Sequence, residues 1–148
     1  MKIFGRPLWH NPKKLINFEL DGKGTSQQIF DIYSFSHITH GILFYFLLKY
    51  LNYNTINGLY ITIILEILCE IFENTHYIIN KYRQKKAFKN YKGDSIVNMI
   101  GDTIFTILGY YLSYKSEKIA ILYMIISEII LMPFKANFLY LSFGSLIK

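Results

Sequence analysis

Long apolar stretches dominate the pattern of hydrophobic and polar residues along the chain. They cover roughly residues 33–53, 58–79 and 94–114, and a fourth starts near residue 119 and meets Pro133. Near-continuous apolar runs of about 18 residues or more are typical of helices that cross a membrane. The pattern therefore predicts an all-α fold, a polytopic membrane bundle with about four transmembrane helices.

The ends of the chain differ from these runs. Residues 1–32 are polar, and they are interpreted as a cytoplasmic N-terminal segment that precedes a transmembrane bundle over residues 33–148. The apolar pieces on either side of Pro133 are each too short to cross a hydrocarbon core of about 30 Å. We therefore expect one kinked fourth span that continues into an interfacial tail.

The basic residues predict the orientation of the bundle. The chain has 16 Lys and Arg residues and a net charge of +6. If the chain has four spans, all the Lys and Arg residues except Lys49, Lys115 and Lys118 lie on one side of the membrane, together with the termini and a basic loop at residues 81–93. Because short cytoplasmic loops are enriched in Lys and Arg, both termini are predicted to be cytoplasmic. The positive charge then indicates contact with anionic membrane lipids, and nucleic acid is not an expected partner.

Acidic residues inside the apolar runs are the main chemical signal. Six of the ten carboxylates fall there, and no Lys or Arg lies deep in any run: Glu66, Glu70, Glu73, Asp94, Asp102 and Glu128. A charged residue at the centre of a transmembrane helix costs about 2.5–3.5 kcal/mol on insertion scales. We therefore expect these carboxylates to face other helices, to be protonated, or to bind something positive.

Polar residues share one face in each of the first three spans. At about 100° per residue the stripes are His37 and His40 in the first span, Glu66, Glu70, Glu73 and Tyr77 in the second, and Asp94, Asn98, Gly101 and Asp102 in the third. The stripes are matched in depth, which predicts a polar cluster within the cytoplasmic leaflet, with Glu66 and Asp102 reaching deeper.

Two interpretations of the histidines remain open. His37-x-x-His40 opposite carboxylates fits a divalent metal site, because imidazole and carboxylate together suit zinc, iron or manganese. In the alternative, the imidazoles donate hydrogen bonds to Glu70 or Asp94 and only satisfy the buried polar groups of the bundle.

Several further residues are candidates for binding near the cytoplasmic surface. Arg83 could pair with Glu73 or hold a lipid phosphate. Asp94 could cap the third helix, and the N-terminus of that helix could accept phosphate. The remaining binding candidates are Glu66, Asn74, Ser95 and Asn98. Glu128 has no evident partner.

The ordered motifs resemble a known family. They are Gly5-Arg6-Pro7, Ser26-Gln27, Asp31-x-Tyr33-Ser34-x-Ser36-His37-x-x-His40-Gly41, Glu66, Glu70-x-x-Glu73-Asn74-Thr75, Lys81-Tyr82-Arg83, Tyr91-x-Gly93-Asp94-Ser95-x-x-Asn98 and Gly101-Asp102. This set resembles an uncharacterised group of small bacterial inner-membrane proteins, known only as a domain of unknown function and loosely VanZ-like. The resemblance implies a multi-pass protein of the cell inner membrane and implies no reaction.

Two classes of function follow. The first is a membrane-embedded enzyme that acts on a lipid or lipid-linked head group. There Glu70, Glu73, Asp94 and Asp102 would act as acids and bases, beside a metal held by His37 and His40. The second is a non-enzymatic membrane protein, a proton or cation carrier or an assembly factor, in which the carboxylates form a binding relay or a structural polar network.

Overall fold

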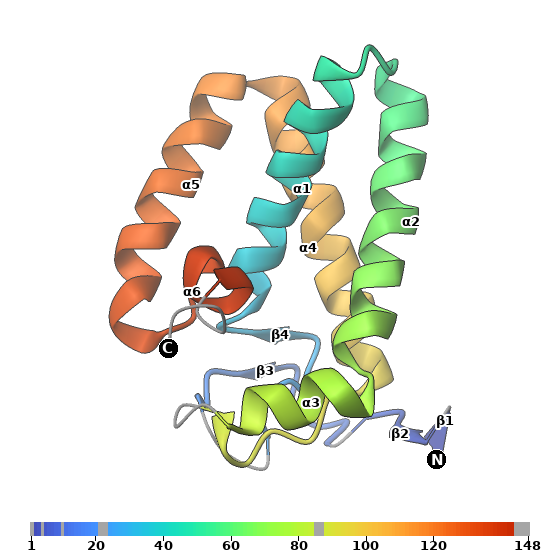
Figure 1. Cartoon of the computed structure of the whole chain (residues 1–148), viewed down its shortest axis with the longest axis vertical. Helices are drawn as coiled ribbons and strands as arrows, with labels where there is room; N and C mark the ends of the chain where they lie inside the picture. Colours follow the sequence, from blue (N-terminus) through green and yellow to red (C-terminus); the bar gives the residue numbers. More distant parts are fainter. Residues whose placement is uncertain (1, 4, 10, 21–23, 85–87, 144–148) are drawn as a thin grey trace.

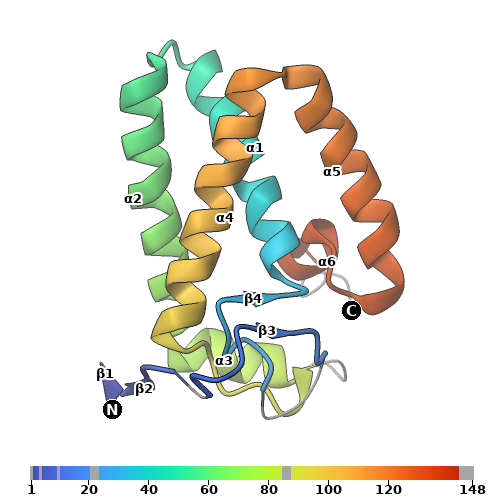
Figure 2. The ribbon, with the colours of Figure 1, turned by 180° about the vertical axis from the view of Figure 1, so that it is seen from behind.

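Four long helices stand side by side in the fold, as seen in a computed structural model that describes residues 2–3, 5–9, 11–20, 24–84 and 88–143 (Figure 1). The long helices are α1 (Ser34–Tyr50), α2 (Thr55–Glu73), α4 (Ile96–Lys115) and α5 (Glu117–Leu131). Successive helices run in opposite directions, so α1 and α4 begin at the same end of the bundle where α2 and α5 finish (Figure 2). The predicted helical class is confirmed.

Short elements form a layer across this same end of the bundle (Figure 1). Strands β1 (Lys2–Ile3) and β2 (Arg6–Pro7) pair antiparallel, and β3 (Ile16–Asn17) and β4 (Phe30–Asp31) pair parallel, with Ile16 opposite Phe30. The layer also contains α3 (His76–Arg83), and the 3-10 turn η2 (Met132–Phe134) leads into α6 (Phe138–Phe143). The N-terminal segment, which was predicted only to precede the bundle, therefore packs against its end.

Polar caps fix where several helices begin. The side chains of Asn54, Thr75, Ser95 and Ser116 each accept a hydrogen bond from the backbone N–H three residues later, at the starts of α2, α3, α4 and α5. Such caps satisfy backbone donors that the first helical turn leaves free. The expected cap of the third span was Asp94, but Ser95 occupies that position, and Asp94 lies just before the helix.

The second predicted span is divided in the structure. α2 ends at Glu73, and Thr75 caps the separate helix α3, which lies across the end of the bundle (Figure 1). Tyr77 is therefore absent from the Glu66–Glu70 stripe, and its side chain is 70% exposed. Asn74 causes the break, because its side chain donates to the Glu70 carbonyl oxygen (3.0 Å) and holds the last turn of α2.

Glycines allow α1 and α4 to pack backbone to backbone. A Cβ atom built on Gly41 would lie 1.8 Å from the Thr106 carbonyl oxygen, and one on Gly109 would lie 1.9 Å from the Ile38 carbonyl oxygen. Any side chain at either position would force the helices apart. This close approach brings the residues at the start of α1 against those of α4.

The helices differ in whether they could cross a membrane. Within the described part of the chain, α2 and α4 have the required length and composition, with hydropathies of 1.7 and 1.2. α1 has 17 residues and α5 has 15, which correspond to about 26 Å and 22 Å. The sequence pattern predicted four membrane spans, whereas two helices of the described residues, α2 and α4, are long and apolar enough to cross a membrane.

The tail after Pro133 folds back instead of continuing outward. Lys135 adopts a left-handed backbone conformation (φ 56°) after η2, and α6 then lies beside the lower part of α1 (Figures 1 and 2). Asn137 donates to Glu128 Oε2 (2.7 Å), which supplies the partner that Glu128 lacked in the sequence analysis. Four of the basic residues assigned to the cytoplasmic side lie outside the described residues: Lys23, Lys85, Lys86 and Lys148.

Candidate functional site

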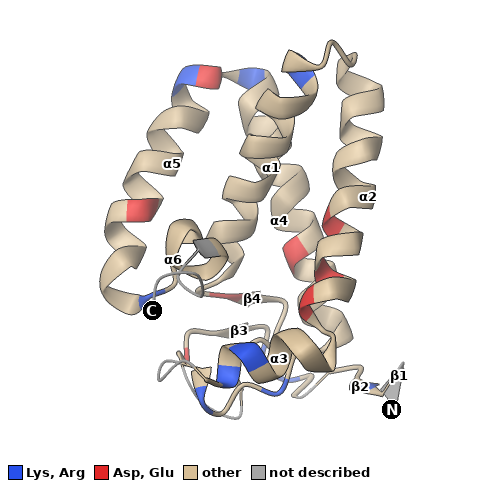
Figure 3. Ribbon diagram, viewed as in Figure 1, with Lys and Arg blue, Asp and Glu red and all other residues tan. Residues whose placement is uncertain are grey.

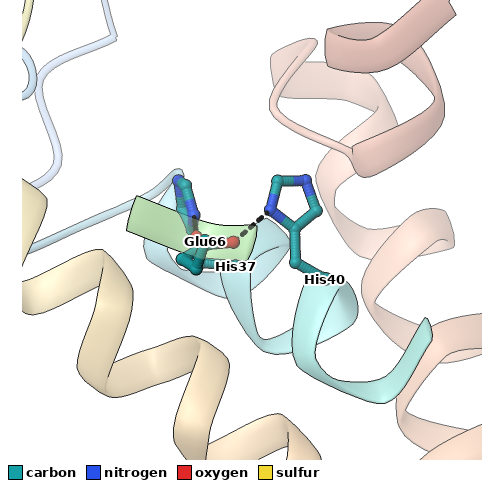
Figure 4. Close-up of side chains that lie close together, drawn as sticks. All are labelled: His37, His40 and Glu66. Carbon is teal, nitrogen blue, oxygen red and sulfur yellow. Dashed lines mark hydrogen bonds and ion pairs between the residues drawn. The ribbon is translucent and has the colours of Figure 1, made fainter. Parts of the chain in front are cut away.

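Glu66 holds two imidazoles in the centre of the candidate site (Figure 4). His37 Nδ1 and Glu66 Oε1 are 2.6 Å apart, and His40 Nδ1 and Glu66 Oε2 are 3.2 Å apart. The histidines lie one turn apart on α1, and Glu66 projects from α2 with its side chain fully buried. With both oxygens engaged, the carboxylate orients the two rings and accepts from their Nδ1–H groups.

His37 is surrounded by two further carboxylates. Its Nδ1 lies 3.6 Å from Glu70 Oε1, and its Nε2 lies 3.8 Å from Asp102 Oδ2. Asp102 is fixed by Ser34, whose hydroxyl donates to Oδ1 (3.1 Å). Glu70 Oε2 is buried and has no hydrogen-bond partner among the described residues. One imidazole thus stands among acids from α2 and α4.

Asp94 links the end of α2 to the start of α4. Its carboxylate accepts from the Asn74 amide (2.6 Å) and from the Tyr91 hydroxyl (2.9 Å), and its backbone N–H donates to Asn74 Oδ1 (2.7 Å). Burial raises the pKa of the Asp94 carboxyl, and the hydrogen bonds from Tyr91 and Asn74 oppose that effect. Asp94 therefore holds the end of α2 and the loop before α4 together through its hydrogen bonds.

Asp31 is a further buried acid, for which the sequence analysis proposed no role. Its Oδ1 accepts from the backbone N–H groups of Tyr33 (2.8 Å) and Ser34 (3.1 Å) at the start of α1. Burial raises the pKa of Asp31 to about 6. An Asp shortly before an apolar run is a helix-start signal, and this signal could have identified it.

A cavity of about 70 Å³ lies beside the histidines at the end of the bundle that carries α3 and α6. It is lined by residues of the N-terminal segment, α1, the last turn of α2, α3, the loop before α4, α4 and α6: Ser26, Tyr33, Ser36, His37, His40, Glu73, Tyr82, Phe88, Tyr91, Asp94, Asp102, Phe138, Leu141 and Ser142. A space of this volume accommodates several water molecules. Imidazoles and carboxylates therefore line the same cavity, which is large enough for water.

The other predicted binding residues are held by hydrogen bonds within the protein. Ser95 donates to the Gln27 carbonyl oxygen (3.1 Å), and Asn98 donates to the Gln28 carbonyl oxygen (2.9 Å), so both anchor the N-terminal segment. Arg83 is exposed, and its Nε donates to the Tyr91 carbonyl oxygen (2.6 Å) rather than pairing with Glu73.

Arg6 has a structural role that was not predicted from the sequence. Its guanidinium donates to the Lys92 carbonyl oxygen (2.6 Å) and to the Asn74 carbonyl oxygen. Gly93 lies beside it with a positive φ of 86°, and a Cβ there would collide with the guanidinium. The Gly5-Arg6-Pro7 motif therefore ties the N-terminal segment to the break between α2 and α3, and it was recognised only as part of the resemblance.

Comparison with known proteins places this chain in a family. The family model described as "Protein of unknown function (DUF2585)" matches residues 2–143. UPF0314 proteins of Sphingopyxis alaskensis and Sinorhizobium fredii are 36% identical over 107 residues and 38% identical over 108 residues, which is 70% and 69% of this chain. A UPF0314 protein of Paracoccus denitrificans is 34% identical over 110 residues, or 73% of the chain.

The match covers 52% of the Sphingopyxis protein and 53% of each of the other two, so the chain spans about half the length of these relatives. No solved structure matches. The chain belongs to the DUF2585 family of proteins of unknown function.

Proposed function

We propose that this chain is a multi-pass inner-membrane protein in which all four long helices cross the bilayer. The support is an inverted distribution of side chains, with polar residues inside and apolar residues outside. Buried polar residues of the bundle include His37, Thr62, Glu66, Glu70, Asn98, Asp102 and Thr106. Exposed apolar residues include Ile56, Ile64, Ile67, Leu68 and Ile71 on α2, and Ile121, Leu122, Ile125, Ile126, Ile129 and Ile130 on α5. An apolar surface of this extent fits contact with lipid.

The charges favour an orientation with the α3 end in the cytoplasm. Basic residues of the described segments gather at that end around α3, whereas the opposite end carries Lys49, Lys115 and Lys118 (Figure 3). The positive-inside rule then puts the N-terminal segment of residues 1–32, the loop at 81–93 and the C-terminal tail on the cytoplasmic side. In intact cells, labelling of a cysteine at Lys89 but not at Asn52 by a membrane-impermeant maleimide would contradict this orientation.

The site supports a membrane-embedded enzyme that acts on a lipid or lipid-linked head group. The observation that carries this function is the cavity that places His40, Glu73 and Asp94 together at the proposed cytoplasmic end. A head group held at this depth would meet these side chains while its acyl chains remain among the apolar helix faces. Glu73 and Asp94 would exchange protons with the substrate, and His40, oriented by Glu66, would provide a third acid-base group.

Removal of the cavity carboxylates should abolish the effect of the protein on membrane lipids. In a host strain that lacks the gene, complementation with wild type should restore the lipid head-group composition measured by mass spectrometry. Glu73→Gln and Asp94→Asn should insert into the membrane at normal levels. Each should restore less than about a tenth of the difference in head-group composition between wild type and the strain without the gene, since acid-base groups contribute roughly 10²- to 10⁴-fold in rate.

The control is Glu117→Gln, because Glu117 is exposed at the far end of the bundle. It should behave as wild type. Normal lipid composition in the strain without the gene, or full complementation by Glu73→Gln and Asp94→Asn, would refute the enzymatic proposal.

Buried hydroxyl groups favour a second function, a proton or cation carrier. Thr62 lies one turn before Glu66 on α2, and its Oγ1 and that of Thr39 are buried without a hydrogen-bond partner among the described residues. These oxygens extend the polar interior beyond the histidines, as a relay through the bundle would require. Dissipation of an imposed proton gradient in proteoliposomes, lost in Glu66→Gln, would support the carrier over the enzyme.

A further inference from the structure

We propose that His37, Glu70 and Asp102 bind a divalent transition-metal ion, with Glu66 acting as the carboxylate that orients His37. This assignment differs from the expectation that His37 and His40 are the ligands. It does not depend on catalysis, because an ion could occupy the site in an enzyme, in a carrier or for structural reasons.

The hydrogen bonds of Glu66 assign it to a supporting role. One oxygen lies 2.6 Å from His37 Nδ1 and the other 3.2 Å from His40 Nδ1, so both oxygens of this side chain already contact an imidazole. A carboxylate on Nδ1 fixes the tautomer of a histidine and leaves Nε2 as the metal ligand. Glu66 therefore presents the Nε2 atom of His37 in the direction of Asp102.

Glu70 supplies an oxygen that the protein leaves unsatisfied. Its Oε2 is buried and has no hydrogen-bond partner among the described residues, and only 4% of the side chain is exposed. An unpaired buried polar atom is costly, and a bound cation would satisfy it. The unsatisfied oxygen of Glu70 therefore supports a cation site independently of the clustering of acidic residues.

The separations fit one ion after small side-chain movements. One ligand atom from each of His37, Glu70 and Asp102 lies within 4.8 Å of the others, and His37 Nε2 is 3.8 Å from Asp102 Oδ2. Ligands at about 2.0–2.2 Å from a common ion lie roughly 3.0–3.6 Å apart, so shifts of about 1 Å are sufficient. Side-chain rotation alone supplies shifts of that size.

The chemistry of the donors indicates which ion would bind. Two carboxylates neutralise a divalent charge, and one imidazole favours zinc, manganese or iron over magnesium and calcium. His37 and Asp102 also line the cavity, so the ion would face it and keep a coordination position open to water or to a substrate oxygen. Three protein ligands with an open fourth position are typical of metal sites that carry out chemistry.

Metal analysis of matched variants tests the assignment. The full chain would be purified in mild detergent, incubated with Zn²⁺ or Mn²⁺, freed of unbound ion and analysed by mass spectrometry for metal. We expect about one ion per wild-type chain and at least a tenfold loss in His37→Ala, Glu70→Gln and Asp102→Asn. His40→Phe and the control Glu128→Gln should retain the ion, and Glu66→Gln should weaken affinity by about 10- to 100-fold.

A second readout separates ligand loss from misfolding. Co²⁺ bound to wild type should give visible absorption bands that are lost in His37→Ala, while circular dichroism and gel filtration show that the variants are folded. Absence of stoichiometric metal in folded wild type would overturn the proposal. Loss of metal in His40→Phe with retention in Glu70→Gln and Asp102→Asn would overturn it in favour of a His37–His40–Glu66 site. Neither result would bear on the lipid-composition test of the Glu73 and Asp94 variants.

Discussion

Replacement of Glu66 by leucine should lower the free energy of unfolding by about 3–5 kcal/mol, because each buried hydrogen-bond donor left without a partner costs about 1–3 kcal/mol. The change leaves the Nδ1 groups of His37 and His40 without their acceptor in the interior of the bundle. Denaturant titration of the detergent-solubilised protein, followed by circular dichroism, would measure the loss.

The matched control for Glu66 is Glu117, which pairs with Lys49 at the exposed end of α5. Glu117→Leu should change the free energy of unfolding little, because exposed ion pairs contribute little. In the background of Glu66→Leu, His37→Phe should recover part of the loss, since it removes one of the stranded polar groups. Equal costs for Glu66→Leu and Glu117→Leu would contradict the central place of Glu66 in the core.

Gly41→Leu should disrupt the bundle more than any conservative change on its surface. Because a Cβ at Gly41 would lie 1.8 Å from a backbone oxygen of α4, the side chain cannot be accommodated by rotating a neighbour. We expect a loss of at least about 3 kcal/mol, at the upper end of overpacking costs, and aggregation after detergent extraction. Fluorescence-detected gel filtration over a temperature series would record it.

Gly58→Ala is the control for this prediction. Gly58 on α2 faces the hydroxyl of Tyr110, a side chain that can move, whereas Gly41 faces backbone. Its effect should be under about 1.5 kcal/mol. A stable, monodisperse Gly41→Leu protein would show that α1 and α4 do not pack through their glycines.

The sequence pattern located the centre of the site because helical periodicity and buried charge are both local signals. Glu66 and Glu70 are four residues apart in an uninterrupted helix, so their shared face follows from geometry. His37 and His40 follow by the same argument. The structure indeed gathers these four side chains, together with Asp102 from α4.

Interruptions of the helices were not predicted, because they depend on tertiary hydrogen bonds. Asn74 ends α2 by binding both the Glu70 carbonyl group and Asp94, which is 20 residues away in the sequence. The periodicity predicted that the helix would continue through Tyr77, because an apolar run gives no sign of such a long-range hydrogen bond. The partner of Glu128 was missed for the same reason, since Asn137 reaches it only after the chain turns at Lys135.

The cavity also lay beyond sequence reasoning. Its walls come from seven segments, and the contribution of α6 depends on the fold-back of a tail that was expected to lie at the interface. Asp31 was recognised only as part of the resemblance, although its burial against the N-terminus of α1 makes it part of the polar interior.

Nitroxide accessibility on α2 tests most directly the claim that a polar interior is enclosed by helices facing lipid. Spin labels at Ile64 and Leu68, both exposed, would be compared in liposomes with one at Asn52 in the turn between α1 and α2, after Cys69→Ser. The account predicts high collision rates with oxygen and low rates with a water-soluble nickel complex at the two helical sites, and the reverse at Asn52. Nickel collision rates at Ile64 and Leu68 as high as at Asn52 would contradict it.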